Sequence, residues 1–106
     1  LTVHDDERPR LLASLGTKPL MLLLTNGLLA KEPTLALAFV RLWTLQRACE
    51  IQMAQAALGP AIPVSETLAK KTTYDSFQFD AKFGAGQDVF DALLRQVDRI
   101  DAGYKN

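Results

Sequence analysis

The chain has 106 residues, 48% of them hydrophobic, and its twelve basic residues balance twelve acidic ones. This length suits one domain rather than two, and this composition argues against disorder. A net charge of zero excludes a general electrostatic attraction to nucleic acid or anionic lipid. The adjacent pair Lys70-Lys71 is best explained as a solvated helix face, so we expect no nucleic-acid partner.

Cysteine content and hydropathy bear on the compartment. The single cysteine, Cys49, excludes an internal disulfide. The first residues lack the basic and apolar regions of a signal peptide, and no stretch reaches the roughly 18 uninterrupted apolar residues of a membrane span. We therefore expect a cytoplasmic protein without a membrane partner. Because the sequence begins with Leu1, we also expect a processed or partial chain.

The first predicted element is a short helix over residues 5–15. Asp5 or Asp6 can cap its start, and Pro9 falls in the first turn, where its missing N–H costs little. Gly16 is well placed to end it.

A β-hairpin is predicted next. Residues 20–25 are almost wholly apolar, which is typical of a buried strand or a buried helix segment, and the flanking residues favour the strand. The dipeptide Asn26-Gly27 is a strong hairpin signal because both residues accept positive φ. Residues 28–30 then return as the partner strand.

A long helix is predicted from Thr34 to about Leu58, ended by Gly59-Pro60. Apolar residues occupy most of its surface, and its charges are Arg41, Arg47 and Glu50, so we expect burial on most sides.

The remaining chain is predicted to form the following segments: a linker at 61–64, a helix from 65 to about 77–80, a loop at 84–86, an amphipathic helix from Asp88 to about 101, and an extended tail at 102–106.

This succession contains too little sheet for an independent domain. An isolated two-stranded hairpin is marginally stable, and this one has no polar face to present to water. Its edges need further strands, from an absent N-terminal region or from another chain. The alternative is an all-helical domain that encloses a small hairpin.

The residues themselves indicate no catalytic group. His4, the sole histidine, lies beside Asp5 and Asp6, but adjacent side chains rarely converge on one metal. Cys49 falls on the apolar stripe of the long helix, where a thiol usually serves packing. The Gly84–Gly86 loop is too short for a phosphate-binding signature.

The order of these segments resembles the C-terminal part of the class II aldolase/adducin domain, in its bacterial adducin-like subgroup. Four blocks carry the resemblance, and together they cover nearly the whole chain: the helix at 5–16, the hairpin at 21–29, the long helix at 34–39 and 45–52, and the ending at 92–101 with Tyr104. The resemblance implies that residues 1–106 are the C-terminal part of one α/β domain. That fold has three layers, α/β/α, around a mainly antiparallel central sheet.

The resemblance also implies a site that this chain does not complete. Catalytic members hold zinc or another divalent metal with three histidines, two of them from the N-terminal part, and the metal stabilises an enediolate. Many members are tetramers with active sites at subunit interfaces, so we expect a homo-oligomer. The third histidine stands directly before the hairpin glycine, where this sequence has Asn26. An amide oxygen is a weak zinc ligand, although Asn26 also suits a turn without any metal role.

Two hypotheses follow from the resemblance. In the first, the protein is an adducin-like member without the complete zinc site, and it acts as a scaffold or oligomeric binding protein with no catalytic or cofactor-binding residue in this chain. In the second, it is a metal-dependent aldolase, epimerase or dehydratase with a changed ligand set, acting on a sugar phosphate or related carbonyl substrate.

Overall fold

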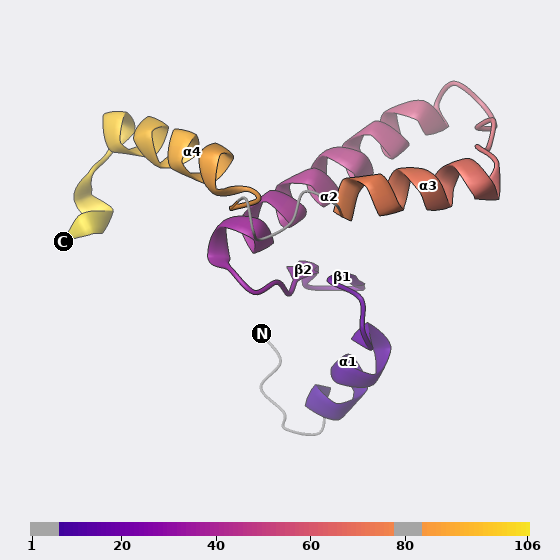
Figure 1. Ribbon diagram of the computed structural model, residues 1–106, viewed down its shortest axis with the longest axis horizontal. Helices are drawn as coiled ribbons and strands as arrows, with labels where there is room; N and C mark the ends of the chain where they lie inside the picture. The colour runs from indigo at the N-terminus through magenta and orange to yellow at the C-terminus, as the bar shows by residue number, and fades with distance from the viewer. Residues whose placement is uncertain (1–6, 78–83) are drawn as a thin grey trace.

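The computed structural model describes residues 7–77 and 84–106. In chain order its elements are α1 (Glu7–Leu15), β1 (Leu20–Leu23), β2 (Gly27–Ala30), α2 (Leu35–Ala56), α3 (Glu66–Phe77), α4 (Gln87–Ile100) and the 3₁₀ turn η2 (Gly103–Lys105) (Figure 1). β1 and β2 pair antiparallel, and within the described residues they form the whole sheet. The chain thus has the mixed helix and sheet content predicted for an α/β protein.

The hairpin is confirmed, but its turn differs from the prediction. Leu23 pairs with Gly27, so that the loop has three residues rather than the two expected at Asn26-Gly27. Gly27 has a φ of +94°, whereas no described non-glycine residue, Asn26 included, has a positive φ. A three-residue loop followed by a positive-φ glycine is a common hairpin closure, so the glycine signal was correct and the assignment of Asn26 was wrong.

The helix α1 begins at Glu7, with Pro9 in its first turn as predicted. The proposed caps Asp5 and Asp6 lie outside the described residues. At the other end, the backbone N–H of Gly16 donates to the carbonyl of Leu12 over 3.0 Å, which closes the last turn.

The long helix α2 begins where the sequence predicts. The hydroxyl of Thr34, the N-cap, accepts a hydrogen bond from the backbone N–H of Leu37 over 3.2 Å. This satisfies one of the unpaired N–H groups at the start of the helix. The helix ends at Ala56, slightly before the predicted end at Leu58, and the side chain of Gln55 donates to the carbonyl of Gly59 over 2.9 Å.

The first half of α2 is the centre of packing. It contacts β2 on one side and α4 on another. Ala36 on α2 and Leu15 on α1 are buried, and the rings of Phe39 and Phe90 meet edge to face at 5.5 Å. An edge-to-face pair adds about 0.5–1.5 kcal/mol to the burial of the two rings. The start of α4 is therefore fixed against α2 by an aromatic contact.

The last two helices agree with the prediction except at their ends. Ser65 caps α3 by accepting the N–H of Leu68 over 3.2 Å. The prediction that α3 continues toward Asp80 concerns residues outside the described part. Asp88 was predicted to cap α4, but Gly86 is the N-cap and Asp88 lies in the first turn. The tail, predicted as extended, instead contains η2, because Tyr104 and Lys105 both turn back to the side chain of Asp98.

The chain is less compact than a folded domain of its length. Its radius of gyration is 16.9 Å, whereas a compact domain of this length has about 13 Å. Its accessible surface is 9175 Å², against about 5,900 Å² for a folded monomer of its mass. The prediction that α2 is buried on most sides is wrong for this chain by itself, since Trp43, Ile51 and Met53 are exposed. Among the described helices, none combines the length and apolarity needed to cross a membrane.

Candidate functional site

The turn between β1 and β2 carries Asn26, which stands where the family resemblance implies a metal-ligating histidine. The strands present this turn at one end of the sheet, where Leu24, Thr25 and Asn26 are all exposed. The hydroxyl of Thr25 lies 3.3 Å from Oδ1 of Asn26 and donates to it. The carboxamide is therefore accessible to a partner, and its oxygen already accepts one hydrogen bond.

The chemistry of this turn does not match a zinc site. A catalytic zinc usually has three protein ligands drawn from His, Cys, Asp and Glu. Residues 7–77 and 84–106 contain no group of three such side chains that could hold a metal. The carboxamide of Asn26 is neutral and binds zinc more weakly than an imidazole would. The described residues of this chain thus do not fit the family's metal by themselves.

The other residues considered from the sequence lie elsewhere. His4 falls outside the described residues. Cys49 is half-buried on α2, a different element from the turn. Arg47 and Glu50 form an ion pair of 2.9 Å, with the Arg47 guanidinium 5.6 Å from the centre of the Trp43 ring. These contacts stabilise the surface of α2 and supply no acid–base pair at the hairpin.

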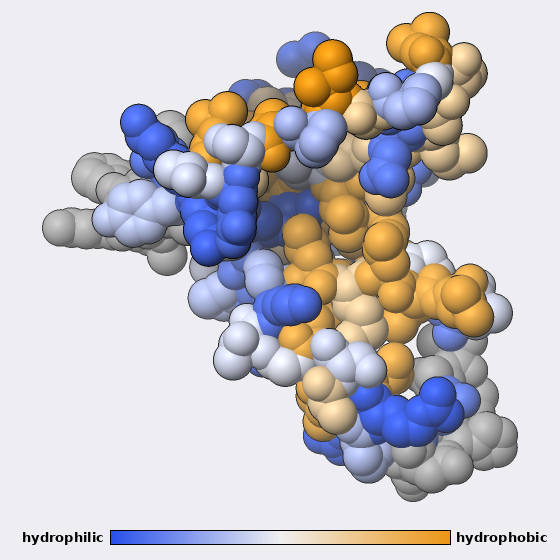
Figure 2. Space-filling model, turned by 90° about the vertical axis from the view of Figure 1, so that its right-hand side faces the viewer, coloured by the Kyte–Doolittle hydropathy of each residue, from blue (hydrophilic) through white to orange (hydrophobic). Residues whose placement is uncertain are grey.

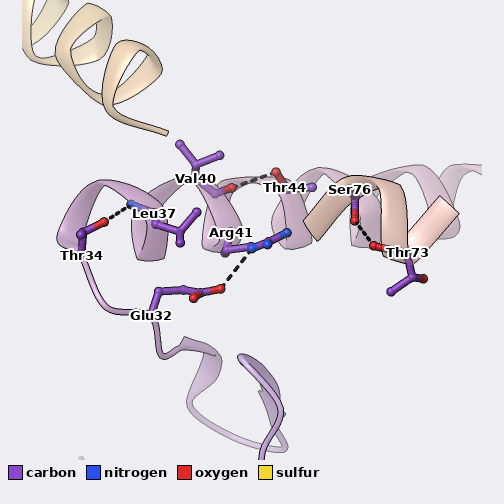
Figure 3. A network of polar contacts seen from close by, with 8 residues as sticks. All are labelled: Glu32, Thr34, Leu37, Val40, Arg41, Thr44, Thr73 and Ser76. Carbon is purple, nitrogen blue, oxygen red and sulfur yellow. Dashed lines mark hydrogen bonds and ion pairs between the residues drawn. The ribbon is translucent and has the colours of Figure 1, made fainter. Parts of the chain in front are cut away.

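An ion pair between the segment after the hairpin and α2 was not predicted from the sequence. Nε of Arg41 donates to Oε1 of Glu32 over 3.1 Å, and the two side chains are only 21% and 12% exposed (Figure 3). Glu32 lies two residues after the end of β2, whereas Arg41 lies on the second turn of α2. The pair therefore connects the segment that follows the hairpin to α2. The available signal was Arg41 itself, a charge within the apolar run at 35–45.

A second polar cluster joins the C-terminal turn to α4. The carboxylate of Asp98 accepts from the hydroxyl of Tyr104 over 2.6 Å and from Nζ of Lys105 over 2.9 Å. These hydrogen bonds, that of Lys105 first, lower the pKa of Asp98. The same carboxylate raises the pKa of Tyr104 and of Lys105. The cluster holds η2 against the end of α4.

Comparison with known proteins identifies relatives along the whole chain. The chain is 34% identical over 108 residues to a protein of Pseudomonas aeruginosa named "Putative aldolase class 2 protein", an alignment that covers 99% of the chain and 42% of the relative. It is 29% identical over 107 residues to a protein of the same name from Caulobacter vibrioides, covering 98% of the chain and 40% of that relative. No family model matches the chain, and no solved structure matches it significantly. The chain spans about two-fifths of the length of these curated relatives.

Proposed function

Because the chain belongs to the class II aldolase family, we propose that it forms one part of an adducin-like domain that lacks the usual complete zinc site. This domain acts as a scaffold or binding protein rather than as an enzyme. The observation that carries the proposal is Asn26, which occupies the position where the resemblance implies a histidine. Its amide oxygen is exposed and accepts a hydrogen bond from Thr25.

Three observations support the proposal that the rest of the domain lies outside this chain. The two strands leave both outer edges of the sheet unpaired within the described residues, and such edges are normally paired or covered. The accessible surface exceeds that of a folded monomer by about half. The curated relatives are more than twice as long as the matched region. Further strands from that remainder would build the three-layer fold around a larger antiparallel sheet.

The rival function is a metal-dependent aldolase, epimerase or dehydratase with a changed ligand set. The observation that favours it is the name of both relatives, which assigns them to the class 2 aldolases. Under this alternative the substrate is a sugar phosphate or a related carbonyl compound, and the metal ligands come mainly from the remaining part of the domain.

Metal content separates the two functions. We expect the full-length protein, as isolated, to contain clearly less than one zinc per chain by plasma mass spectrometry, and Asn26→Ala to leave that content unchanged. The matched variant Asn26→His restores the imidazole, and it raises zinc content only if the other ligands of the family are present. One tightly bound zinc per chain that is lost in Asn26→Ala would refute the proposal.

A further inference from the structure

The turn between β1 and β2 places an asparagine directly before a glycine. Hydrophobic side chains gather over much of the face of the molecule shown in Figure 2, and both strands of the hairpin are apolar. At the end of this hairpin Thr25 and Asn26 present polar groups, and residues 24–27 are all exposed. Water therefore has access to both Asn26 and Gly27.

The dipeptide Asn26-Gly27 contains the two groups of an intramolecular reaction. Asparagine is among the thermolabile residues of proteins, because the backbone nitrogen of the next residue can attack its side-chain carbonyl carbon. Glycine in that next position hinders the attack least, since it has no Cβ and its backbone adopts many conformations. Gly27 has a φ of +94°, and within the described part of the chain nothing but its own neighbours lies within 4 Å of where a Cβ would be. Packing thus does not hold this glycine in place.

Thr25 places a hydrogen-bond donor on the side-chain oxygen of Asn26. Its hydroxyl donates to Oδ1 over 3.3 Å. When the carbonyl carbon is attacked, negative charge develops on this oxygen, and a donor that already points at it stabilises that charge. The amide nitrogen, which is the leaving group, has no hydrogen-bond partner among residues 7–77 and 84–106. The turn therefore favours the attack and does not retain the leaving group.

We propose that Asn26-Gly27 is a site of spontaneous deamidation, promoted by the hydroxyl of Thr25. The backbone nitrogen of Gly27 bonds to Cγ of Asn26 and loses its proton, the bond from Cγ to the amide nitrogen breaks, and this nitrogen takes up a proton through the solvent and leaves as ammonia. The product is a succinimide ring. Water then opens the ring at either of its two carbonyls, which gives aspartate or isoaspartate. The reaction needs water as its co-reactant, and it changes no oxidation state.

Both products alter the turn. Each replaces a neutral amide with a carboxylate, and so adds one negative charge to a chain of zero formal net charge. Isoaspartate also lengthens, by one main-chain atom, the loop that sets the pairing of Leu23 with Gly27. The importance of this change rests on the proposed function, in which Asn26 stands in place of a metal-ligating histidine. The reaction itself does not depend on zinc.

Mass spectrometry of the full-length protein tests the proposal directly. The protein is kept in neutral buffer made with heavy-oxygen water and is then digested in ordinary water. The tryptic peptide 11–31 contains Asn26 and no other asparagine or glutamine. We expect this peptide to take up heavy oxygen in proportion to the time before digestion, and to separate into an aspartate and an isoaspartate form. A folded protein whose peptide takes up no heavy oxygen would overturn the proposal, and the free peptide 11–31 then shows whether the fold prevents the reaction.

Three variants of the turn give the second measurement. Asn26→Gln keeps the amide but requires a larger ring, so we expect no uptake. Thr25→Val removes the hydroxyl at nearly constant shape, and we expect it to slow the uptake several-fold, whereas Thr25→Ser restores the rate. Equal rates with threonine and valine would overturn the role of Thr25. If a variant fails to fold, the time course of the unaltered protein decides the question. Zinc content is measured separately, so a failure of this inference leaves the proposed function standing.

Discussion

Replacing Gly86 with alanine tests the close contact between α4 and α2. Gly86 has a φ of +83°, and a Cβ built on it would lie 3.0 Å from the carbonyl oxygen of Ala36 and 3.2 Å from Cγ2 of Val40. The carbonyl belongs to the backbone of α2, so it cannot rotate away as a long side chain could. The first turn of α4 would have to move away from α2 by a few tenths of an ångström.

The expected loss has two contributions. The left-handed backbone costs alanine about 1–2 kcal/mol relative to glycine, and crowding against a packed helix adds about 1–3 kcal/mol. Gly84 provides a matched control in the same loop, because it also has a positive φ of +65° while its nearest neighbour, Cβ of Gln87, lies at an ordinary 3.7 Å. Gly84→Ala should therefore show the backbone contribution alone.

Urea denaturation of the full-length protein, followed by far-UV circular dichroism, measures both losses. We expect Gly86→Ala to lower the free energy of unfolding by about 2–5 kcal/mol and Gly84→Ala by about 1–2 kcal/mol. Equal losses in the two variants, or a larger loss in Gly84→Ala, would refute the reasoning, because the contact with α2 would then have no measurable cost.

Two further predictions concern the C-terminal cluster and the chain as a whole. Because the hydrogen bonds from Lys105 and Tyr104 lower the pKa of Asp98, they stabilise the C-terminal turn above the ordinary carboxyl pKa, and this contribution is lost as the pH falls through the folded value. A carboxyl NMR titration should show the pKa of Asp98 moving back up in Tyr104→Phe and further up in Lys105→Met; a wild-type value at or above the ordinary one would contradict this. Residues 1–106 alone should not form a stable, soluble monomer, given 9175 Å² of accessible surface. A cooperative melt at monomeric mass would show that the hairpin needs no further strands.

Local signals in the sequence were sufficient to place most elements. The predicted starts of α2 and α3 are confirmed by side-chain caps. The hydroxyl of Thr34 caps α2 and that of Ser65 caps α3, because a cap depends only on neighbouring N–H groups. The start of α4 was harder to predict, because Gly86 lies close to Ala36, some fifty residues earlier in the chain. A side-chain cap by Asp88 was a reasonable local expectation, and tertiary packing overrode it.

In the candidate site, too, local features could be predicted from the sequence and long-range contacts could not. Asn26 could be singled out only because the family resemblance implies a histidine directly before the hairpin glycine. The three-residue loop depends on the register of Leu23 with Gly27, which no single residue encodes. The Glu32–Arg41 ion pair joins residues on two elements, so that neither residue predicts it alone. The choice between a metal-free and a metal-dependent protein needs ligands that residues 7–77 and 84–106 do not supply.

Because α4 contacts α2 only near Gly86 within the described residues, a small rotation there would displace the far end of α4. The contacts described between α4 and α2 lie in the first turn of α4, at Gly86 and Phe90. In Figure 1 the remainder of the helix runs away from α2 toward the C-terminus. Its 14 residues span about 21 Å, so a rotation of roughly 10° at Gly86 would carry the Asp98–Tyr104–Lys105 cluster through about 4 Å. A small change in the fit of one glycine would thus be amplified into a displacement of the chain's end.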